Sequence, residues 1–294
     1  MIGGGLAGSL LALELAALAE SVRLIEAGDG DTATALSYGL IPPGGGAAAW
    51  QRLRRLHRIE GLRRRWLQLG RRGWPLPALQ VEPQRFSTSV RDALQRLGVE
   101  RQQRRIEAPW QLDALLAEGP VVLACGSGCR RLAPGLSDRL RSSWAGILDL
   151  APAAMPSPRW LARLPARFER LALERRTEPL RQEQWIVDAG LVPCGERLLA
   201  GQITLLRPGL EPGPPPEPAL MEQRLREGLA RRWPALARLP GRYRQAAVSF
   251  SSNGVPLAEP CGKGLWVLAG FSGAFRELPA SALSLAARIT AQPT

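Results

Sequence analysis

Apolar positions are unevenly distributed along the chain, and the first element they predict is a helix near the N-terminus. Residues 6–20 are rich in alanine and leucine, lack proline, and lack glycine once the opening turn is passed. This composition favours a helix. The next residues, SVRLIEAG, place Val22, Leu24 and Ile25 in a run typical of a short buried strand, which ends in the acid Glu26.

A second periodic stretch covers residues 50–72 and is rich in arginine. Its apolar side chains recur every three or four positions, at Leu53, Leu56, Ile59, Leu62, Trp66 and Leu69. This spacing predicts an amphipathic helix with an arginine outer face. We interpret it as a solvated helix packed on the rest of the fold, with contact to RNA or a membrane as the alternative.

Two further buried strands are indicated by short β-branched and apolar runs. One covers Val121–Cys125 and is closed by Gly126, and the other covers Gly264–Gly270. The second strand runs into a short turn. A helix is then predicted over Pro279–Ile289, where leucine and isoleucine supply an apolar surface.

The region from 144 to 206 has a different pattern, made of short extended runs separated by proline, glycine and charged residues. The runs are WAGILDL, QWIVDAGLVP and ERLLAGQITLL, and they predict antiparallel strands. Residues 207–218 form a rigid, proline-rich connector. Residues 219–233 then predict another helix.

The composition limits the size of the core and the number of domains that these elements can form. With 294 residues and 45% hydrophobic content, the chain can bury a sizeable core as one large domain or two intertwined ones. The net charge is +13, and Lys263 is the only lysine. Almost all basic residues are arginine, which fits a gene rich in G and C. A polyanionic partner is the alternative explanation of the positive charge.

No apolar run reaches the roughly 18 residues that a membrane-spanning helix needs. The nearest candidate, residues 6–19, is interrupted by Ser9 and Glu14 and lacks the basic start of a signal peptide. The sequence therefore predicts no membrane span and a cytoplasmic location.

The sequence contains few residues that could bind a metal ion. The four cysteines, Cys125, Cys129, Cys194 and Cys261, contain no CxxC pair, and His57 is the only histidine. A zinc site would lack ligands. We expect reduced, packed cysteines and no metal.

The glycines before the first helix carry the clearest chemical signal. Gly3, Gly5 and Gly8 satisfy G-x-G-x-x-G, and Glu26 lies 18 residues after the last of them. Glycines let a backbone approach a pyrophosphate at a helix N-terminus, and an acid at this distance can accept hydrogen bonds from ribose hydroxyls. The pattern predicts a dinucleotide site, and a plain tight turn is the alternative.

One part of this unit is short. A first strand normally supplies five or six residues before the glycines, whereas only Met1 and Ile2 precede them here. That strand is central in a doubly wound sheet, and its loss costs buried surface. We expect either a start placed too far downstream or a truncated chain, and favour the first.

Four motifs in this order resemble FAD-dependent oxidoreductases of the glycine oxidase and D-amino-acid oxidase (DAO) type: GGGLAGS…VRLIEAG, TALSYGLIPP, GPVVLACGSG and NGVPLAEPCGKGLWVLAGFSGAF. The resemblance spans both ends and the middle of the chain. It implies an α/β fold in which a Rossmann-like, FAD-binding parallel sheet with a truncated first strand is interleaved with a reduced antiparallel-sheet substrate domain. The implied boundaries are 1–70, 81–135 and 245–294 for the FAD-binding domain and 140–244 for the substrate domain.

The same resemblance implies which residues contact FAD. The N-terminal glycine turn holds the pyrophosphate, Glu26 the adenosine, and the loop at Ser37 lines the pyrophosphate and flavin, while the C-terminal turn faces the flavin pyrimidine ring. The full set is Gly3, Gly5, Leu6, Ala7, Gly8, Glu26, Ser37, Gly39, Gly126, Gly270, Phe271, Ser272 and Gly273.

The residues that would hold a substrate depart from the family pattern. In amino-acid oxidases of this type an arginine binds the substrate carboxylate, and Val248 stands at the matching position. Ala274 and Phe275 replace the histidine–glycine pair that often follows GFSG. Arg244 or Arg276 could substitute for the missing arginine, and Arg276, close to the flavin-facing turn, is the better candidate.

Three functions remain compatible with the sequence. The first is an FAD-dependent oxidoreductase that oxidises a small amine or amino-acid-like substrate by hydride transfer, with oxygen or another electron acceptor. The second is a tRNA-modifying flavin oxidoreductase acting on an aminomethyl uridine, and the third is a catalytically degenerate FAD-binding protein. Tyr243 and Trp185 are candidate pocket walls, with ordinary packing as the alternative.

Overall fold

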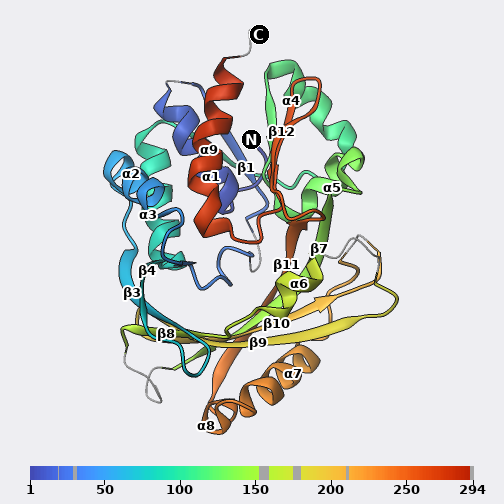
Figure 1. Cartoon of the computed structure of the whole chain (residues 1–294). Coiled ribbons are helices and arrows are strands. Elements are labelled where there is room, and N and C mark those ends of the chain that lie inside the picture. The colour runs from blue at the N-terminus through green and yellow to red at the C-terminus, as the bar shows by residue number, and fades with distance from the viewer. Residues whose placement is uncertain (19, 29–31, 152–158, 175–179, 210–211, 292–294) are drawn as a thin grey trace.

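Two layers of strands with different hydrogen-bonding patterns make up the molecule (Figure 1). The computed structural model describes residues 1–18, 20–28, 32–151, 159–174, 180–209 and 212–291. The upper layer in Figure 1 contains short strands surrounded by helices, and we call it the parallel layer. The lower layer is a large curved sheet with helical segments beneath it.

The strands of the parallel layer are short, and three of them, β1, β6 and β13, are largely buried apolar runs followed by a glycine or ending in an acid. Two of them, β1 and β5, pair in parallel, and β6 pairs in parallel with β13, which pairs antiparallel with β12. Their bounds are β1 Arg23–Glu26, β5 Glu100–Gln103, β6 Val121–Leu123, β12 Leu257–Gly262 and β13 Leu265–Ala269.

Ile2 joins the two halves of this layer. It forms parallel bridges to Ile25 of β1 and to Leu123 of β6. The Ile2 N–H donates to the Val122 carbonyl at 2.9 Å, and the Gly3 N–H donates to the Ile25 carbonyl at 2.8 Å. The first residues therefore lie in the central position of the layer and deliver the glycine turn to the edge where the strands end.

Helices cover the parallel layer with apolar side chains. Helix α1 packs against α9 and α3, and its leucines are buried within one large cluster. The helices of this layer are α1 Leu6–Ala17, α2 Ala47–His57, α3 Pro83–Arg96, α4 Leu112–Glu118, α5 Cys129–Leu132 and α9 Ala274–Thr290. Short 3₁₀ turns lie at η1 Pro109–Gln111, η2 Gly126–Gly128 and η3 Pro134–Leu136.

The C-terminal helix begins earlier than the sequence predicts. The sequence predicts a start at Pro279, whereas α9 starts at Ala274 and contains the proline. Proline has no N–H, so the Phe275 carbonyl four residues earlier loses its helical partner. The buried Trp50 indole N–H donates to that carbonyl instead, and its ring stacks on Phe275 with centroids 5.8 Å apart. A long-range contact thus sustains the first turns of α9.

The large sheet has eight strands in the order β11-β7-β10-β9-β8-β3-β4-β2, paired antiparallel except for β3 with β8. Long apolar runs with buried positions along most of their length build its centre. The strands are β2 Leu40–Ile41, β3 Leu62–Leu69, β4 Leu76–Val81, β7 Leu140–Leu150, β8 Leu161–Leu164, β9 Gln184–Cys194, β10 Arg197–Leu206 and β11 Gly241–Ser251.

The prediction of one helix over residues 50–72 is wrong beyond its first half. Helix α2 ends at His57, and residues 62–69 form strand β3. Arg58 and Gly61 have positive φ angles of 54° and 94°, which stop the helix. The released segment pairs with β4 and β8, so distant partners decide its structure.

Some strands of the large sheet lie within the segments that are expected to form the FAD-binding domain. Strand β3 lies inside the segment 1–70, and residues 245–251 of β11 lie inside the segment 245–294, yet both belong to the large sheet. Strand β4 begins in the short region between the first two of these segments and belongs to the same sheet.

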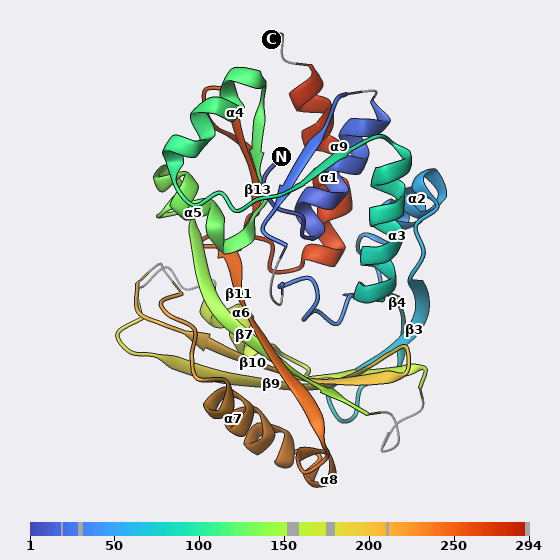
Figure 2. The ribbon, with the colours of Figure 1, turned by 180° about the vertical axis from the view of Figure 1, so that it is seen from behind.

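The two faces of the large sheet have different coverings. The outer face packs against α7 (Pro218–Ala230) and the adjacent α8 (Pro234–Ala237), which bury Met221, Leu225 and Leu229. The inner face looks toward the parallel layer, and α6 (Glu169–Glu174) lies between the two layers in both Figure 1 and Figure 2. Within the described ranges, no helix is long and apolar enough to cross a membrane.

Candidate cofactor and substrate site

The strands of the parallel layer end at one edge, and the predicted cofactor residues gather there. Glu26 is the last residue of β1, Gly126 follows β6, and Gly270 follows β13. The glycine turn leads out of the central position between β1 and β6 at the same edge. The carboxyl ends of parallel strands are where ligands bind in open α/β sheets.

The three glycines of the turn have different surroundings. A Cβ on Gly3 would lie 2.5 Å from the Ala124 carbonyl oxygen, and a Cβ on Gly8 would overlap the Gly3 carbonyl. A Cβ on Gly5 would meet only the Thr34 hydroxyl, at 3.6 Å. Gly3 and Gly8 are therefore required by packing, whereas Gly5 leaves open space in front of the helix.

That space lies at the N-terminus of α1, where Leu6 and Ala7 are the first helical residues. The Leu6 N–H donates to the Thr34 hydroxyl at 3.0 Å. The first turn contains no acidic residue, and Gly5 at the N-cap provides no side chain. The partial positive charge of this helix end is thus available to an anion such as a pyrophosphate.

Glu26 lies beside the same turn. One carboxylate oxygen occupies the space that a Cβ on Gly4 would fill, and the other oxygen forms an ion pair with Arg101 of β5. The side chain is one quarter exposed, at 25%. A carboxylate in this position can accept hydrogen bonds from ribose hydroxyls, as the sequence predicts.

The loop that contains Ser37 and Gly39 is fixed to β4. Gly39 has a φ of 63°, and a Cβ there would overlap the Val81 carbonyl. The Ser37 hydroxyl accepts a hydrogen bond from the Gly39 N–H at 3.1 Å, and the Val81 N–H donates to the Gly39 carbonyl at 2.8 Å. Both residues therefore shape the loop itself.

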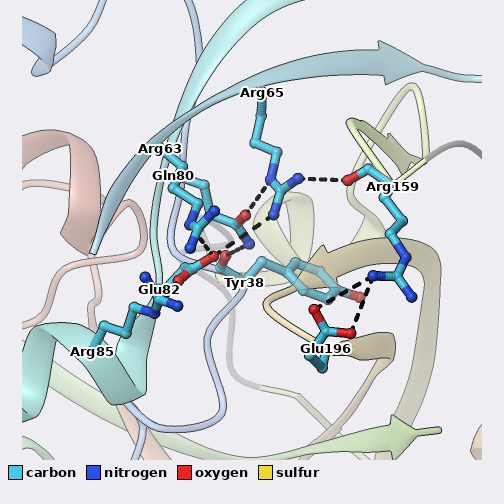
Figure 3. Close-up of polar contacts among 8 residues, drawn as sticks. All are labelled: Tyr38, Arg63, Arg65, Gln80, Glu82, Arg85, Arg159 and Glu196. Carbon is cyan, nitrogen blue, oxygen red and sulfur yellow. Dashed lines mark hydrogen bonds and ion pairs between the residues drawn. The ribbon is translucent and has the colours of Figure 1, made fainter. Parts of the chain in front are cut away.

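A buried polar network supports this loop from the large sheet (Figure 3). The Gln80 side chain donates to the Tyr38 carbonyl at 3.0 Å and accepts from Arg65 Nε at 2.6 Å. The neighbouring Glu82 carboxylate is buried and lies 2.6 Å from Arg63 Nε and 3.2 Å from Arg85 Nε. No sequence motif indicated this network, because its members come from β3, β4 and α3 and meet only in the fold.

The C-terminal turn approaches the large sheet closely. Gly270 has a φ of 82°, and a Cβ there would lie 3.0 Å from Leu140 and 3.1 Å from the Ser251 nitrogen. Phe271 packs at the edge of the α1–α9 core, and Gly273 is the N-cap of α9. The turn thus places a helix N-terminus at the junction of the two layers.

Helix α6 reaches this turn from the sheet side. The Ser272 hydroxyl donates to the Glu174 carboxylate at 3.0 Å, and Arg170 lies 3.4 Å from the other carboxylate oxygen. Asp188 of β9 accepts hydrogen bonds from the backbone N–H groups of Glu169 and Arg170 at 3.0 and 3.4 Å. Sequence reasoning missed these residues; the i,i+4 spacing of Arg170 and Glu174 predicts an ion pair but not its location.

Neither arginine proposed as a carboxylate anchor lies free in this space. Arg276 is half exposed, at 51%, and pairs with the adjacent Glu277. Arg244 donates to the Ala35 carbonyl at 2.5 Å and so contacts the loop that follows β1. Val248 pairs with Ser143 across β11 and β7, which places two uncharged side chains at the expected anchor position.

Tyr243 and Trp185 belong to the packing between the large sheet and α7. Both are partly buried against the cluster that contains Leu225, and Arg224 of α7 lies 4.3 Å from the centre of the Trp185 ring. The Tyr243 hydroxyl donates to Gln245 at 3.1 Å. Their positions on the outer face fit ordinary packing and not a pocket wall.

No protein-family model and no curated protein sequence matches the chain. Solved structures do match it over nearly its full length. Glycine oxidase from Geobacillus kaustophilus gives a TM-score of 0.71 at 16% identity, covering 100% of this chain and 94% of that one. Iminodiacetate oxidase from a Chelativorans species gives 0.68 at 14% identity, covering 100% and 95%.

A third similar structure is L-amino acid deaminase from Proteus myxofaciens in complex with anthranilate. It gives a TM-score of 0.66 at 12% identity and covers 99% of this chain and 89% of that one. At these identities the similarity establishes the fold. The resemblance that the motifs predict is therefore confirmed as a fold: a parallel sheet interleaved with a large antiparallel-rich sheet, as in DAO-type oxidoreductases.

Proposed function

We propose that the chain binds FAD along the carboxyl edge of the parallel layer and oxidises a small amine or amino-acid-like substrate. The observation that carries this proposal is the N-terminus of α1, where Gly5 leaves space for a ligand next to the Glu26 carboxylate. An anionic group and a ribose fit these two features together.

The residues that would hold FAD fall into three groups. Gly5 and Ala7 would present backbone N–H groups to the pyrophosphate beside Leu6, whose own N–H donates to the Thr34 hydroxyl, while Gly3 and Gly8 allow the turn to close. The ribose and flavin contacts that we propose are Glu26, Ser37, Gly39, Gly126, Gly270, Phe271, Ser272 and Gly273.

When bound, the flavin supplies the acceptor for a hydride from the carbon that carries the amine. The protein contributes a helix N-terminus at Gly273, whose partial positive charge favours negative charge nearby. It also contributes apolar inner-face residues, Ile186, Leu206 and Phe250, which are buried in one cluster and exclude water from that part of the sheet.

The names of the similar structures support an amine or amino acid as substrate. Glycine oxidase, iminodiacetate oxidase and L-amino acid deaminase are named for compounds with a carbon–nitrogen bond of this kind. Because Val248 stands at the anchor position, the proposed function does not require a carboxylate on the substrate.

Anaerobic reduction of the bound flavin tests this function. FAD-loaded protein is mixed without oxygen with a panel of primary and secondary amines and amino acids, and the yellow flavin absorbance is followed. We expect at least one compound to bleach it and oxygen to restore it. Loaded flavin that no member of a broad panel bleaches would contradict the oxidase proposal.

A further inference from the structure

Two cysteines lie together just after strand β6. Cys125 is the residue before the η2 turn, and Cys129 is the first residue of α5. Their Sγ atoms are 3.6 Å apart, and the Gly128 N–H donates to the Cys125 carbonyl at 3.1 Å, which folds the intervening residues into one turn. Both cysteines are free thiols. A disulfide has an S–S distance of about 2.05 Å, so a small movement of the two side chains would join them.

The two thiols differ in their access to solvent. Cys125 is partly exposed, whereas Cys129 is fully buried within the apolar cluster that contains Val121 and Leu123. An oxidant in solution therefore reaches Cys125 first. Cys129 needs no contact with solvent to react, because its target is the neighbouring sulfur 3.6 Å away.

Their protonation also differs. A hydrogen bond from the Cys129 thiol lowers the pKa of Cys125; burial opposes this effect, and the charge of Arg131 adds to it. The same hydrogen bond, burial and the charge of Cys125 raise the pKa of Cys129 well above its ordinary value. Cys125 is therefore the thiolate of the pair, and Cys129 is its proton donor. The thiolate is the reactive form of a cysteine.

The other two cysteines are less reactive by the same criterion. Burial, and then the charge of Glu259, raises the pKa of Cys261 to about 11, and this residue packs beside the same apolar cluster. Burial is also the main cause that raises the pKa of Cys194, which lies on β9 in the large sheet. Both thiols stay protonated at neutral pH. Of the four cysteines, Cys125 is the one that its surroundings activate.

We propose that Cys125 and Cys129 form a reversible oxidation site, in which hydrogen peroxide oxidises Cys125 and Cys129 then closes a disulfide. The Cys125 thiolate attacks one peroxide oxygen, the O–O bond breaks, and hydroxide leaves a sulfenic acid on Cys125. The Cys129 sulfur next attacks the Cys125 sulfur and displaces its hydroxyl group. The thiol protons leave as water, so two thiols and one hydrogen peroxide give one disulfide and two water molecules.

This site lies beside the proposed cofactor edge, because Gly126 is the next residue after Cys125. An oxidase that passes two electrons from its flavin to oxygen produces hydrogen peroxide. A supply of peroxide from within the protein therefore rests on the proposed function. The thiol reaction itself requires no flavin, so added hydrogen peroxide tests it separately: its failure leaves the proposed function standing, and colourless protein leaves the thiol pair standing.

A map of tryptic peptides tests the pair directly. The full chain is treated with hydrogen peroxide at neutral pH, alkylated, and digested without reduction. Cys125 and Cys129 fall in one peptide, 106–130, whereas Cys194 and Cys261 fall in peptides 182–197 and 245–263. We expect peptide 106–130 to lose the mass of two hydrogen atoms and to take up no alkylating label, and dithiothreitol to restore both labels.

Three results of this map would overturn the proposal. The first is a peptide 106–130 that keeps both labels. The second is a disulfide between peptides 106–130 and 245–263, which would make Cys261 the partner. The third is a peptide 106–130 that gains oxygen atoms while Cys129 keeps its label.

Serine variants then assign the two roles. In Cys129→Ser we expect the oxidation of Cys125 to stop at the sulfenic acid, which dimedone labels. In Cys125→Ser we expect Cys129 to be oxidised at least about tenfold more slowly than in wild type. Cys194→Ser is the matched control and should form the disulfide at the wild-type rate. Equal oxidation of Cys129 with and without Cys125 would contradict these roles, and if a variant does not fold, the wild-type map still decides.

Discussion

The carboxyl edge of the parallel layer and the inner face of the large sheet face each other, yet they are built from different parts of the chain. The edge is made of backbone: Gly3, Gly5 and Gly8 form it, and close carbonyl contacts fix its shape. The inner face is made of side chains from separate strands and from α6, such as Glu174 and Tyr38. A backbone site leaves a readable glycine pattern in the sequence, whereas a side-chain site assembled from distant segments does not.

The largest effect should come from Gly8, which closes the glycine turn. A Cβ at this position overlaps the Gly3 carbonyl, so Gly8→Ala must displace backbone in the core of the parallel layer. We expect a loss of more than about 3 kcal/mol in the free energy of unfolding, measured by chemical denaturation. Gly135→Ala is the control, since a Cβ there meets no atom within 4 Å. Equal stability of both variants would refute the packing role.

Gly5 lies in the same turn, but its substitution should leave the stability unchanged and lower the affinity for FAD. The protein has room for a Cβ, whose nearest neighbour would be Thr34 at 3.6 Å, so Gly5→Ala should unfold at the wild-type temperature. A pyrophosphate needs that space, and we expect FAD affinity to fall by about tenfold or more. Titration of the apoprotein with FAD, followed by flavin fluorescence, measures this loss. Unchanged affinity would place the cofactor elsewhere.

The parallel layer also depends on one contact that no glycine pattern reveals. Trp50→Phe removes the indole N–H that donates to the Phe275 carbonyl, which Pro279 cannot serve. The carbonyl stays buried and unpaired, so we expect a loss of about 1–2 kcal/mol in unfolding free energy. Trp110→Phe, on the exposed surface, is the matched control and should change little. A loss no greater than that of the control would show that the hydrogen bond is not needed.

The smallest effect concerns His57 at the end of α2. Burial, then the charges of Arg52 and Arg96, lowers its pKa below the ordinary value of about 6.5. The unfolded chain therefore binds the proton more readily, and the protein loses stability as the pH falls through about 6.5. Unfolding free energies at about pH 7.5 and 5.5 should differ more in wild type than in His57→Gln. The same pH slope in both proteins would contradict this assignment.

The elements that sequence predicts well are those whose signal is local. Helix α1, strand β1 and strands β6 and β13 follow from continuous apolar runs closed by glycine or acid, and the structure places them as expected. The three-to-four spacing over residues 62–69 assigns Trp66 and Leu69 to the apolar face, but both are exposed and Leu67 is the buried residue. Pairing with β4 and β8 makes this segment a strand, and this pairing is a property of the whole fold.

The residues of the candidate site also differ in whether their signal in the sequence is local. Glu26 and the glycines could be found from spacing, because a cofactor turn requires those residue types at those intervals. Glu174 and Arg170 could not, because only the tertiary position of α6 brings them to Ser272. The arginines that sequence favoured, Arg276 and Arg244, are engaged by Glu277 and by the Ala35 carbonyl.

The absorbance spectrum of the purified protein tests the central claim most directly. The protein is incubated with excess FAD, freed of unbound cofactor, and its flavin absorbance is compared with its protein absorbance. The Glu26 carboxylate, which is proposed to bind the adenosine, and the N-terminus of α1 at Gly5 lie at one edge. They predict that close to one FAD binds per chain. Folded protein that remains colourless after this treatment would contradict the account.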